Sequence, residues 1–212
     1  MLETVGTNEL KKMILGAVEQ IRNEHRYLSE LDSVIGDGDH GTTILRGMNN
    51  LAKLLDKTTT TDLKDLLYEL GWSMLGVDGG STGPLLGSLL MGMSDAVEGK
   101  STLDCQSVAM MFEGGLANVQ KQTKAKVGDK TMIDALAPAV KALEEGANAG
   151  LDIVETVQKA SEAAEAGARS TKDLQARFGR AKNLGERTIG HQDPGATSMS
   201  LIFKGFLQGL SE

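Results

Sequence analysis

Leucine, alanine and methionine recur at helical spacing along most of this chain, and almost no segment has the β-branched and aromatic enrichment of a strand. One apolar stripe is clear near the N-terminus, where it would comprise Leu10, Met13, Ile14, Ala17, Val18 and Ile21. The same spacing predicts eight helices, over residues 8–29, 41–56, 62–77, 82–97, 102–123, 131–149, 151–176 and 194–210. We therefore expect an all-α protein.

Short connections between these helices predict their arrangement. Residues 99–101 and 148–150 leave room only for tight turns, so consecutive helices should be antiparallel neighbours in an up-and-down barrel or bundle. In that topology the first, third, fifth and seventh connections meet at one end, and the other three meet at the opposite end. Aromatic residues make up only 3% of the chain, so the core must be built mainly from Leu, Ala, Met and Val. We expect one domain over residues 1–212.

Charge and cysteine content exclude several classes of protein. The chain has 22 basic and 29 acidic residues, a net charge of −7, which disfavours nucleic-acid binding. Its longest apolar stretch is far shorter than the ~18 residues of a membrane span, and the N-terminus shows no signal peptide. The single cysteine, Cys105, cannot form an internal disulfide, which suits a reducing compartment. We expect a cytoplasmic protein without nucleic-acid or membrane partners.

The unusual sequence is concentrated in the connections predicted to share one end of the bundle. These are residues 32–41, 79–84, 128–132 and 179–195, whereas the connections at the other end are short and simple. Each of the four leads into the N-terminus of an even-numbered helix. Four helix N-termini with unpaired N–H groups would therefore converge at this end, which is an arrangement that binds anions.

Three carboxylates occupy the first of these connections. Asp32, Asp37 and Asp39 would repel one another if they converged without a counter-charge, and Mg²⁺ is usually held by such carboxylates together with phosphates and water. A solvated acidic turn, with Asp39 capping the next helix, explains the residues as well. An EF-hand fits poorly because Gly41 occupies the third alternate ligand position, and zinc is disfavoured because His40 has no cysteine beside it.

The other connections suit phosphate binding without requiring it. Residues 79–84 can present backbone N–H groups and two hydroxyls to a phosphate, but an ordinary Ser/Thr-capped helix start explains them equally. The segment before Asp193 and Pro194 is basic, containing Arg177, Arg180, Lys182 and Arg187. It would suit a lid over polyphosphate or a solvated loop. No Walker A motif is present. Only the segregation of these loops to one end favours a binding site.

Four motifs are recognisable together: LDSVIGDGDHG at 31–41, GGSTGP at 79–84, GDKTMID at 128–134 and GERTIGHQDPGATS at 185–198. They closely resemble the motifs of the nucleotide-binding L subunits of bacterial dihydroxyacetone kinases, and the resemblance spans nearly the whole chain. It implies a barrel of eight antiparallel helices with the nucleotide bound at one end. That is the end at which the loop argument locates an anion site.

The resemblance also implies individual ligands. Asp32, Asp37 and Asp39 would coordinate two Mg²⁺ ions that bridge the diphosphate of tightly bound ADP or ATP. The nucleotide would contact His40, Gly41, Thr42, Thr43, Ser81, Thr82, Thr123, Met132, Arg180, Asp193, Pro194 and Gly195. Met132 would line the adenine pocket, and Arg180 would close over the nucleotide with residues 193–195. Family members often have glycine at the position of Thr123. No general base for a substrate hydroxyl is evident in the sequence.

The family works with partner subunits. In it, a K subunit holds the triose covalently through a histidine, and a phosphohistidine on the M subunit of the phosphoenolpyruvate phosphotransferase system recharges ADP that stays on the L subunit. Because no second domain follows before Glu212, we expect this mode rather than the solvent exchange of fused, ATP-dependent kinases. A kinase subunit for another short ketose, one using exchangeable ATP, and a non-catalytic nucleotide sensor are the alternatives. The sequence is compatible with a homodimer.

Overall fold

The computed structural model describes residues 2–211, and in that range it contains eight α-helices and two 3₁₀ helices. The α-helices are α1 (Thr7–Ile35), α2 (His40–Lys57), α3 (Leu63–Leu75), α4 (Thr82–Ala96), α5 (Cys105–Gln122), α6 (Ile133–Asn148), α7 (Ile153–Ser170) and α8 (Pro194–Ser211). The 3₁₀ helices, η1 (Thr171–Asp173) and η2 (Arg180–Thr188), lie between α7 and α8. The predicted all-α class is confirmed.

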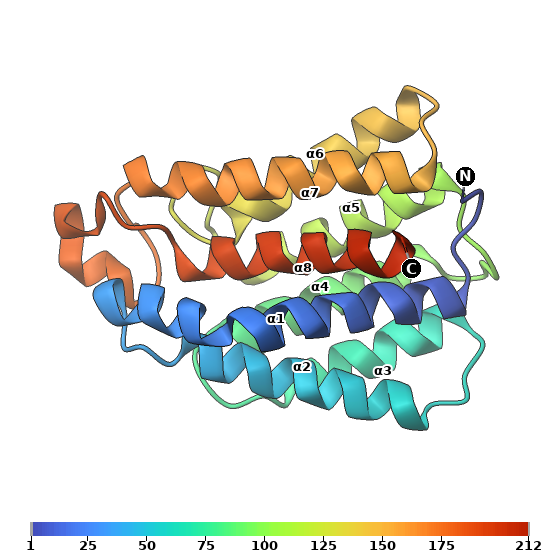
Figure 1. The fold of residues 1–212 in the computed structure, drawn as a ribbon, viewed down its shortest axis with the longest axis horizontal. Coiled ribbons are helices and arrows are strands. Elements are labelled where there is room, and N and C mark those ends of the chain that lie inside the picture. The colour runs from blue at the N-terminus through green and yellow to red at the C-terminus, as the bar shows by residue number, and fades with distance from the viewer. Residues whose placement is uncertain (1, 212) are drawn as a thin grey trace.

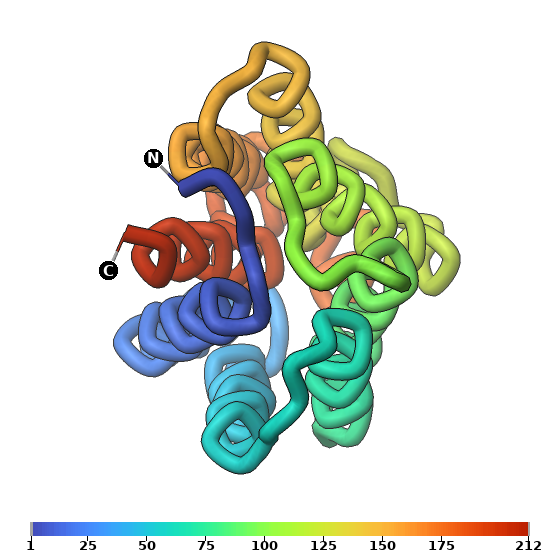
Figure 2. The backbone as a smooth tube through the Cα atoms, turned by 90° about the vertical axis from the view of Figure 1, so that its right-hand side faces the viewer, coloured from blue at the N-terminus to red at the C-terminus, as the bar shows by residue number. Residues whose placement is uncertain are grey.

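The helices form a closed ring. Each packs against its neighbours in sequence, and α8 completes the ring by packing along α1 (Figure 2). Consecutive helices run antiparallel, as the short connections predicted (Figure 1). The segment containing η2 lies at the left of Figure 1, at the C-terminal end of α1, and both chain termini lie toward the other end of the barrel.

Two predicted helix ends were wrong by six residues each, and both lie at the functional end. The first helix continues past residue 29 to Ile35, because Leu28, Asp32 and Ile35 extend its buried face. Asp32 is therefore in the last turn of α1 rather than in a loop, and Gly36 ends the helix. The seventh helix ends at Ser170 instead of residue 176, where the Thr171 hydroxyl donates to the carbonyl of Ala168 at 2.6 Å.

Close helix contacts explain many glycines outside the loops. A Cβ on Gly16 of α1 would lie 2.1 Å from the carbonyl oxygen of Gly205 of α8, and one on Gly92 of α4 would lie 2.4 Å from the carbonyl oxygen of Gly114 of α5. Both distances are far inside van der Waals contact, so these helices can pack this closely only without side chains there. The glycine excess thus serves the barrel wall as well as the functional loops.

Candidate functional site

A cavity of about 420 Å³ opens at the end where the four unusual connections meet. Each connection contributes to its lining, so the predicted segregation of these loops to one end is confirmed. Twelve of the fifteen predicted site residues line it: Asp32, Asp37, Asp39, His40, Ser81, Thr82, Thr123, Met132, Arg180, Asp193, Pro194 and Gly195.

The other three predicted residues, in the first turn of α2, do not line the cavity. Gly41 packs against α1, where an added Cβ would lie 1.9 Å from the carbonyl oxygen of His25. Thr42 is exposed and its hydroxyl donates to the carbonyl of Asp39, whereas Thr43 is buried against Gly79. Gly41 and Thr43 thus support the walls of the site through their packing.

Three carboxylates converge on one side of the cavity. Asp32, Asp37 and Asp39 each offer an oxygen, and these oxygens lie within 4.8 Å of one another. Asp32 is buried and accepts a hydrogen bond from the backbone N–H of His40 at 3.1 Å. Asp39 makes no side-chain cap to α2, so the interpretation of this residue as a simple helix cap is wrong. A donor set of carboxylate oxygens alone suits a hard cation such as Mg²⁺.

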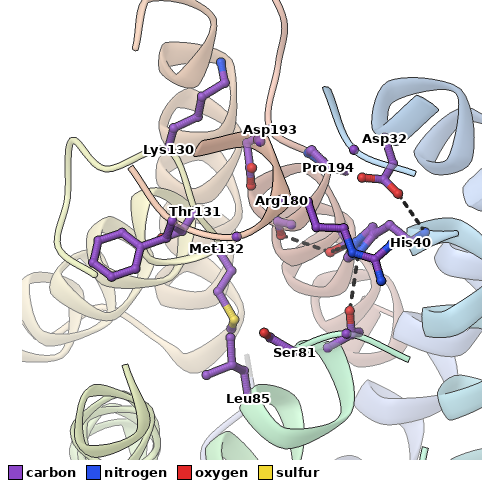
Figure 3. Close-up of a pocket in the computed structure, with 18 of the residues that line it drawn as sticks. Asp32, His40, Ser81, Leu85, Lys130, Thr131, Met132, Arg180, Asp193 and Pro194 are labelled. Atoms are coloured by element: carbon purple, nitrogen blue, oxygen red, sulfur yellow. Dashed lines mark hydrogen bonds between the residues drawn. The ribbon is translucent and has the colours of Figure 1, made fainter. Parts of the chain in front are cut away.

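Arg180 brings a positive charge to this cluster. It opens η2, and its guanidinium forms an ion pair with the Asp37 carboxylate. Figure 3 shows the Arg180 side chain extending across the cavity between Asp193 and His40. The segment before α8 therefore reaches over the mouth of the site, in the position expected of a lid.

Helix starts at the two ends of the barrel are built differently. Those of α3, α5 and α7, at the opposite end, are capped by aspartates that accept from the N–H three residues ahead: Asp62, Asp104 and Asp152. Those of α2, α4 and α6, at the cavity, have no side-chain cap hydrogen bond from their cap residues, Asp39, Ser81 and Met132. The helix dipoles at the cavity therefore favour an anion.

The start of α8 is the exception at this end. The Asp193 carboxylate accepts from the backbone N–H of Ala196 at 2.7 Å and caps the helix. Burial raises the pKa of Asp193 to about 7, against the opposing effects of the Ala196 hydrogen bond and the Lys130 charge. Pro194 follows as the first helical residue, where its missing N–H is not needed.

A hydrogen-bonded histidine connects three helices across the floor of the cavity. Ser198 donates its hydroxyl hydrogen to the carbonyl of Gly195, so the His40 Nε2 donates to the Ser198 oxygen at 3.0 Å. The Nδ1 atom of His40 then accepts from the hydroxyl of Thr82 at 3.3 Å. Burial lowers the pKa of His40, which favours this neutral form although Asp32 opposes the shift.

The remaining wall of the cavity is apolar. Met132 lines it with Leu85, Leu86 and Met199, and Figure 3 shows the Met132 sulfur pointing toward Leu85. The site thus combines clustered carboxylates and helix N-termini with an apolar slot. Such a combination can bind a ligand that has a planar apolar group and an anionic group.

Comparison with known proteins agrees with this geometry. A family model described as the DAK2 domain matches residues 34–208. The chain belongs to the DAK2 domain family. Within this family, the chain is 40% identical over 190 residues to "PEP-dependent dihydroxyacetone kinase 1, ADP-binding subunit DhaL" of Listeria innocua, covering 90% of each protein. It is 38% identical to the corresponding ADP-binding subunit of Escherichia coli over 181 residues, covering 85% of this chain and 86% of that one.

Other DAK2 relatives are larger. The chain is 34% identical to human triokinase/FMN cyclase over 185 residues, 87% of this chain but 32% of the human protein. The dihydroxyacetone kinase of C. freundii superposes with a TM-score of 0.74 at 27% identity, covering 95% of this chain and 34% of that one. These enzymes therefore contain a DAK2 domain as one part of a longer protein. No helix among residues 2–211 is long and apolar enough to cross a membrane.

Sequence reasoning missed three polar residues of the DAK2 cavity, Lys130, Thr131 and Ser198. All three line it, and Ser198 anchors His40. These residues lie in the motifs GDKTMID and GERTIGHQDPGATS, which carry the family resemblance, so the sequence marks their neighbourhood as important. The roles of Lys130 and Ser198 depend on partners distant in sequence, which no local pattern reveals.

Proposed function

We propose that this protein is the ADP-binding phosphotransferase subunit of a phosphoenolpyruvate-dependent dihydroxyacetone kinase. The observation that carries the proposal is the cavity, where three clustered carboxylates face an apolar slot at the N-termini of four helices. The full-length relatives named as ADP-binding subunits support the same assignment. In this function, ADP bound here is phosphorylated in place by the phosphohistidine M subunit, and the γ-phosphate passes to dihydroxyacetone on the K subunit.

The carboxylate cluster suits the cations of such a site. Asp32, Asp37 and Asp39 would hold two Mg²⁺ ions, because all three offer oxygen ligands and their mutual repulsion requires a counter-charge. Bound Mg²⁺ would supply neutralisation of the diphosphate charge. Ser81 and Thr82 lie at the start of α4, which has no side-chain cap, and would contact the phosphates. Met132 lies on the apolar wall and would contact the adenine.

The chain's own contribution is to position the nucleotide and neutralise its charge. His40 is not a free base: its Nε2 hydrogen is donated to Ser198, and its Nδ1 accepts from Thr82. Phosphoryl transfer depends mainly on alignment and electrostatic stabilisation, so a site of this kind needs no base of its own. The acceptor hydroxyl would be activated on the K subunit, where the substrate is held.

The nucleotide content of the purified protein tests the proposal. We expect about one ADP per chain, released when Mg²⁺ is chelated, and phosphorylation of dihydroxyacetone from phosphoenolpyruvate when K and M subunits are added. Protein that neither binds ADP nor supports this reaction would refute the assignment. ADP retention without any transfer would instead identify a nucleotide sensor.

An alternative is a subunit that exchanges ATP with solvent and works without the phosphotransferase system, as the likeness to a kinase solved with AMP-PNP and Mg²⁺ suggests. That structure superposes with a TM-score of 0.73 at 27% identity, covering 95% of this chain and 33% of that one. Chasing bound ADP with labelled ATP separates the two modes. Exchange that is complete within seconds favours free ATP, whereas slow exchange favours a resident coenzyme. Comparing dihydroxyacetone with other short ketoses in the transfer assay identifies the acceptor.

A further inference from the structure

Lys130 is a buried cation that the proposed phosphotransfer does not use. Only 2% of its surface is exposed, although lysine is almost never fully buried. It lies just before Thr131 and Met132 of the cavity wall, with a backbone φ of +60°. Left-handed backbone is unfavourable for a residue with a Cβ, so the surrounding structure must hold this conformation in place.

The ammonium group of Lys130 bonds to both ends of the lid, the segment of residues 171–193 between α7 and α8. Its Nζ donates to the carbonyl of Thr171 at 2.5 Å and to the carbonyl of His191. Figure 3 shows the side chain extending away from Met132 and Ser81. The lysine therefore acts on the base of the lid and does not point at the proposed phosphate positions.

Other contacts at the lid base converge on the same place. The backbone N–H of Gly190 donates to the carbonyl of Lys172 at 2.7 Å, and that of Asp193 donates to the Thr171 hydroxyl at 2.9 Å. The Arg177 N–H donates to the carbonyl of Asp129, the residue before Lys130. The first two contacts join the two ends of the lid, the third joins the lid to the loop of Lys130, and the Lys130 ammonium group bonds to both ends at once.

Three carboxylates lie close enough to Lys130 to favour its charged form. Burial lowers its pKa, and the carboxylates of Asp193, Asp134 and Asp173 oppose that shift. Asp134 also fixes the loop that carries Lys130, because its carboxylate accepts from the N–H groups of Gly128 and Thr131 at 2.6 and 2.7 Å. The loop beside the apolar slot and the base of the lid are thus one hydrogen-bonded unit.

We propose that Lys130 is a positioning residue that couples the nucleotide-binding loop to the lid, holding the lid base closed so that Arg180 reaches Asp37 across the cavity. This inference rests on the proposed function for its nucleotide, but the lid contacts stand independently of any ligand. Loss of Lys130 should free the lid, remove Arg180 from the carboxylate cluster and speed the release of bound ADP.

Tryptic cleavage of the full-length protein measures lid opening directly. The lid contains five cleavage sites, after Lys172, Arg177, Arg180, Lys182 and Arg187, and cleavage there requires local opening. We expect Lys130→Met to raise the rate of lid cleavage at least about tenfold, since losing one hydrogen bond to a charged group suffices for that factor. ADP dissociation in Mg²⁺ should accelerate by a similar factor.

A matched control separates positioning from general loss of stability. Ser94 is buried, and its hydroxyl donates to the backbone carbonyl of Lys64 at 2.8 Å at the opposite end of the barrel. Ser94→Ala removes this hydrogen bond. It should leave lid cleavage and ADP release at wild-type rates. If Lys130→Met does not fold, Lys130→Gly replaces it, because glycine adopts the positive φ without strain.

The outcomes distinguish this inference from the proposed function. Faster lid cleavage in a folded Lys130 variant, measured without nucleotide, supports the inference even if the wild-type protein binds no ADP. Lid cleavage at the wild-type rate in a folded Lys130 variant overturns it, whatever the protein binds. Equal acceleration by Ser94→Ala also overturns it, because the effect would then reflect general destabilisation.

Discussion

Replacing Asp37 with asparagine tests whether the three carboxylates form a cation site. The change keeps the shape of the side chain and removes one of three charges whose oxygens lie within 4.8 Å of one another. Two like charges at that separation repel by about 1 kcal/mol in water and about 3 kcal/mol near a protein surface. The ion pair with Arg180 is lost at the same time, but its side chains are 38% and 61% exposed, so it contributes no more than about 1 kcal/mol. Without Mg²⁺, the variant should therefore be at least as stable as the wild type.

Mg²⁺ and ADP should reverse this order of stability. A ligand that binds only the folded state at 100 times its Kd adds about 2.7 kcal/mol to the free energy of unfolding. For a chain of this length, each 1 kcal/mol raises Tm by about 2–4 °C, so wild-type Tm should rise by about 5–10 °C. Asp37→Asn should lose most of that rise, because the cation would lack one of its three carboxylate ligands.

Thermal unfolding followed by circular dichroism measures the effect in EDTA, in Mg²⁺ and in Mg²⁺ with ADP. Asp56→Asn provides the control, since it removes the same charge from an exposed position in the last turn of α2, at the opposite end of the barrel. It should keep the full response to Mg²⁺ and ADP. A wild-type response in Asp37→Asn would show that the carboxylate cluster does not hold the cation.

Three further substitutions test the barrel and its electrostatics. Gly205→Ala should lower the free energy of unfolding in urea by about 1–3 kcal/mol, because the new Cβ would lie 2.3 Å from the Cα of Ala17; no loss would mean that α1 and α8 pack less closely. Phe112→Ala should cost about 3–5 kcal/mol in the same assay, because Phe112 is buried against two other phenylalanines at ring distances of 5.3 and 5.6 Å. Burial raises the pKa of Asp193 to about 7, so without ligands its ionisation should destabilise the folded protein as pH rises from about 4 to 7. The urea midpoint of Asp193→Asn should therefore rise relative to that of the wild type as the pH increases over that interval. A difference in midpoint that does not change with pH would contradict the raised pKa of Asp193.

The architecture of the barrel was predictable because it depends on local patterns. Apolar residues at helical spacing identified all eight α-helices, and the short turns at residues 99–101 and 148–150 fixed neighbouring helices as antiparallel. In an up-and-down topology, successive connections alternate between the two ends of the barrel. The four unusual loops therefore had to meet at one end, and a cavity could be predicted there although each loop alone had a simpler explanation. The errors at Asp32 and Thr171 arose because helix ends are decided by individual caps and buried positions, and not by periodicity.

Contacts between distant segments were beyond the reach of the sequence. Gly16 and Gly205 are separated by almost the whole chain, and nothing near either residue indicates that their backbones touch. Lys130 has the same character, since the carbonyls of Thr171 and His191 that it bonds belong to another part of the chain. Its motif marks the loop as important, but only the fold identifies the lid as the partner.

The unpaired N–H groups at helix N-termini are treated differently at the two ends of the barrel. At one end, aspartates cap α3, α5 and α7 and stabilise the fold. At the other end, α2, α4 and α6 lack such caps, and each missing cap costs typically about 1 kcal/mol. At α2 and α6 another side chain accepts one N–H each, Asp32 from His40 and Thr131 from Ile133, so the three starts together forgo less than the roughly 3 kcal/mol of three full caps. The functional end should therefore be the less stable end until an anion binds, and ligand binding should stabilise the loops there more than the opposite end.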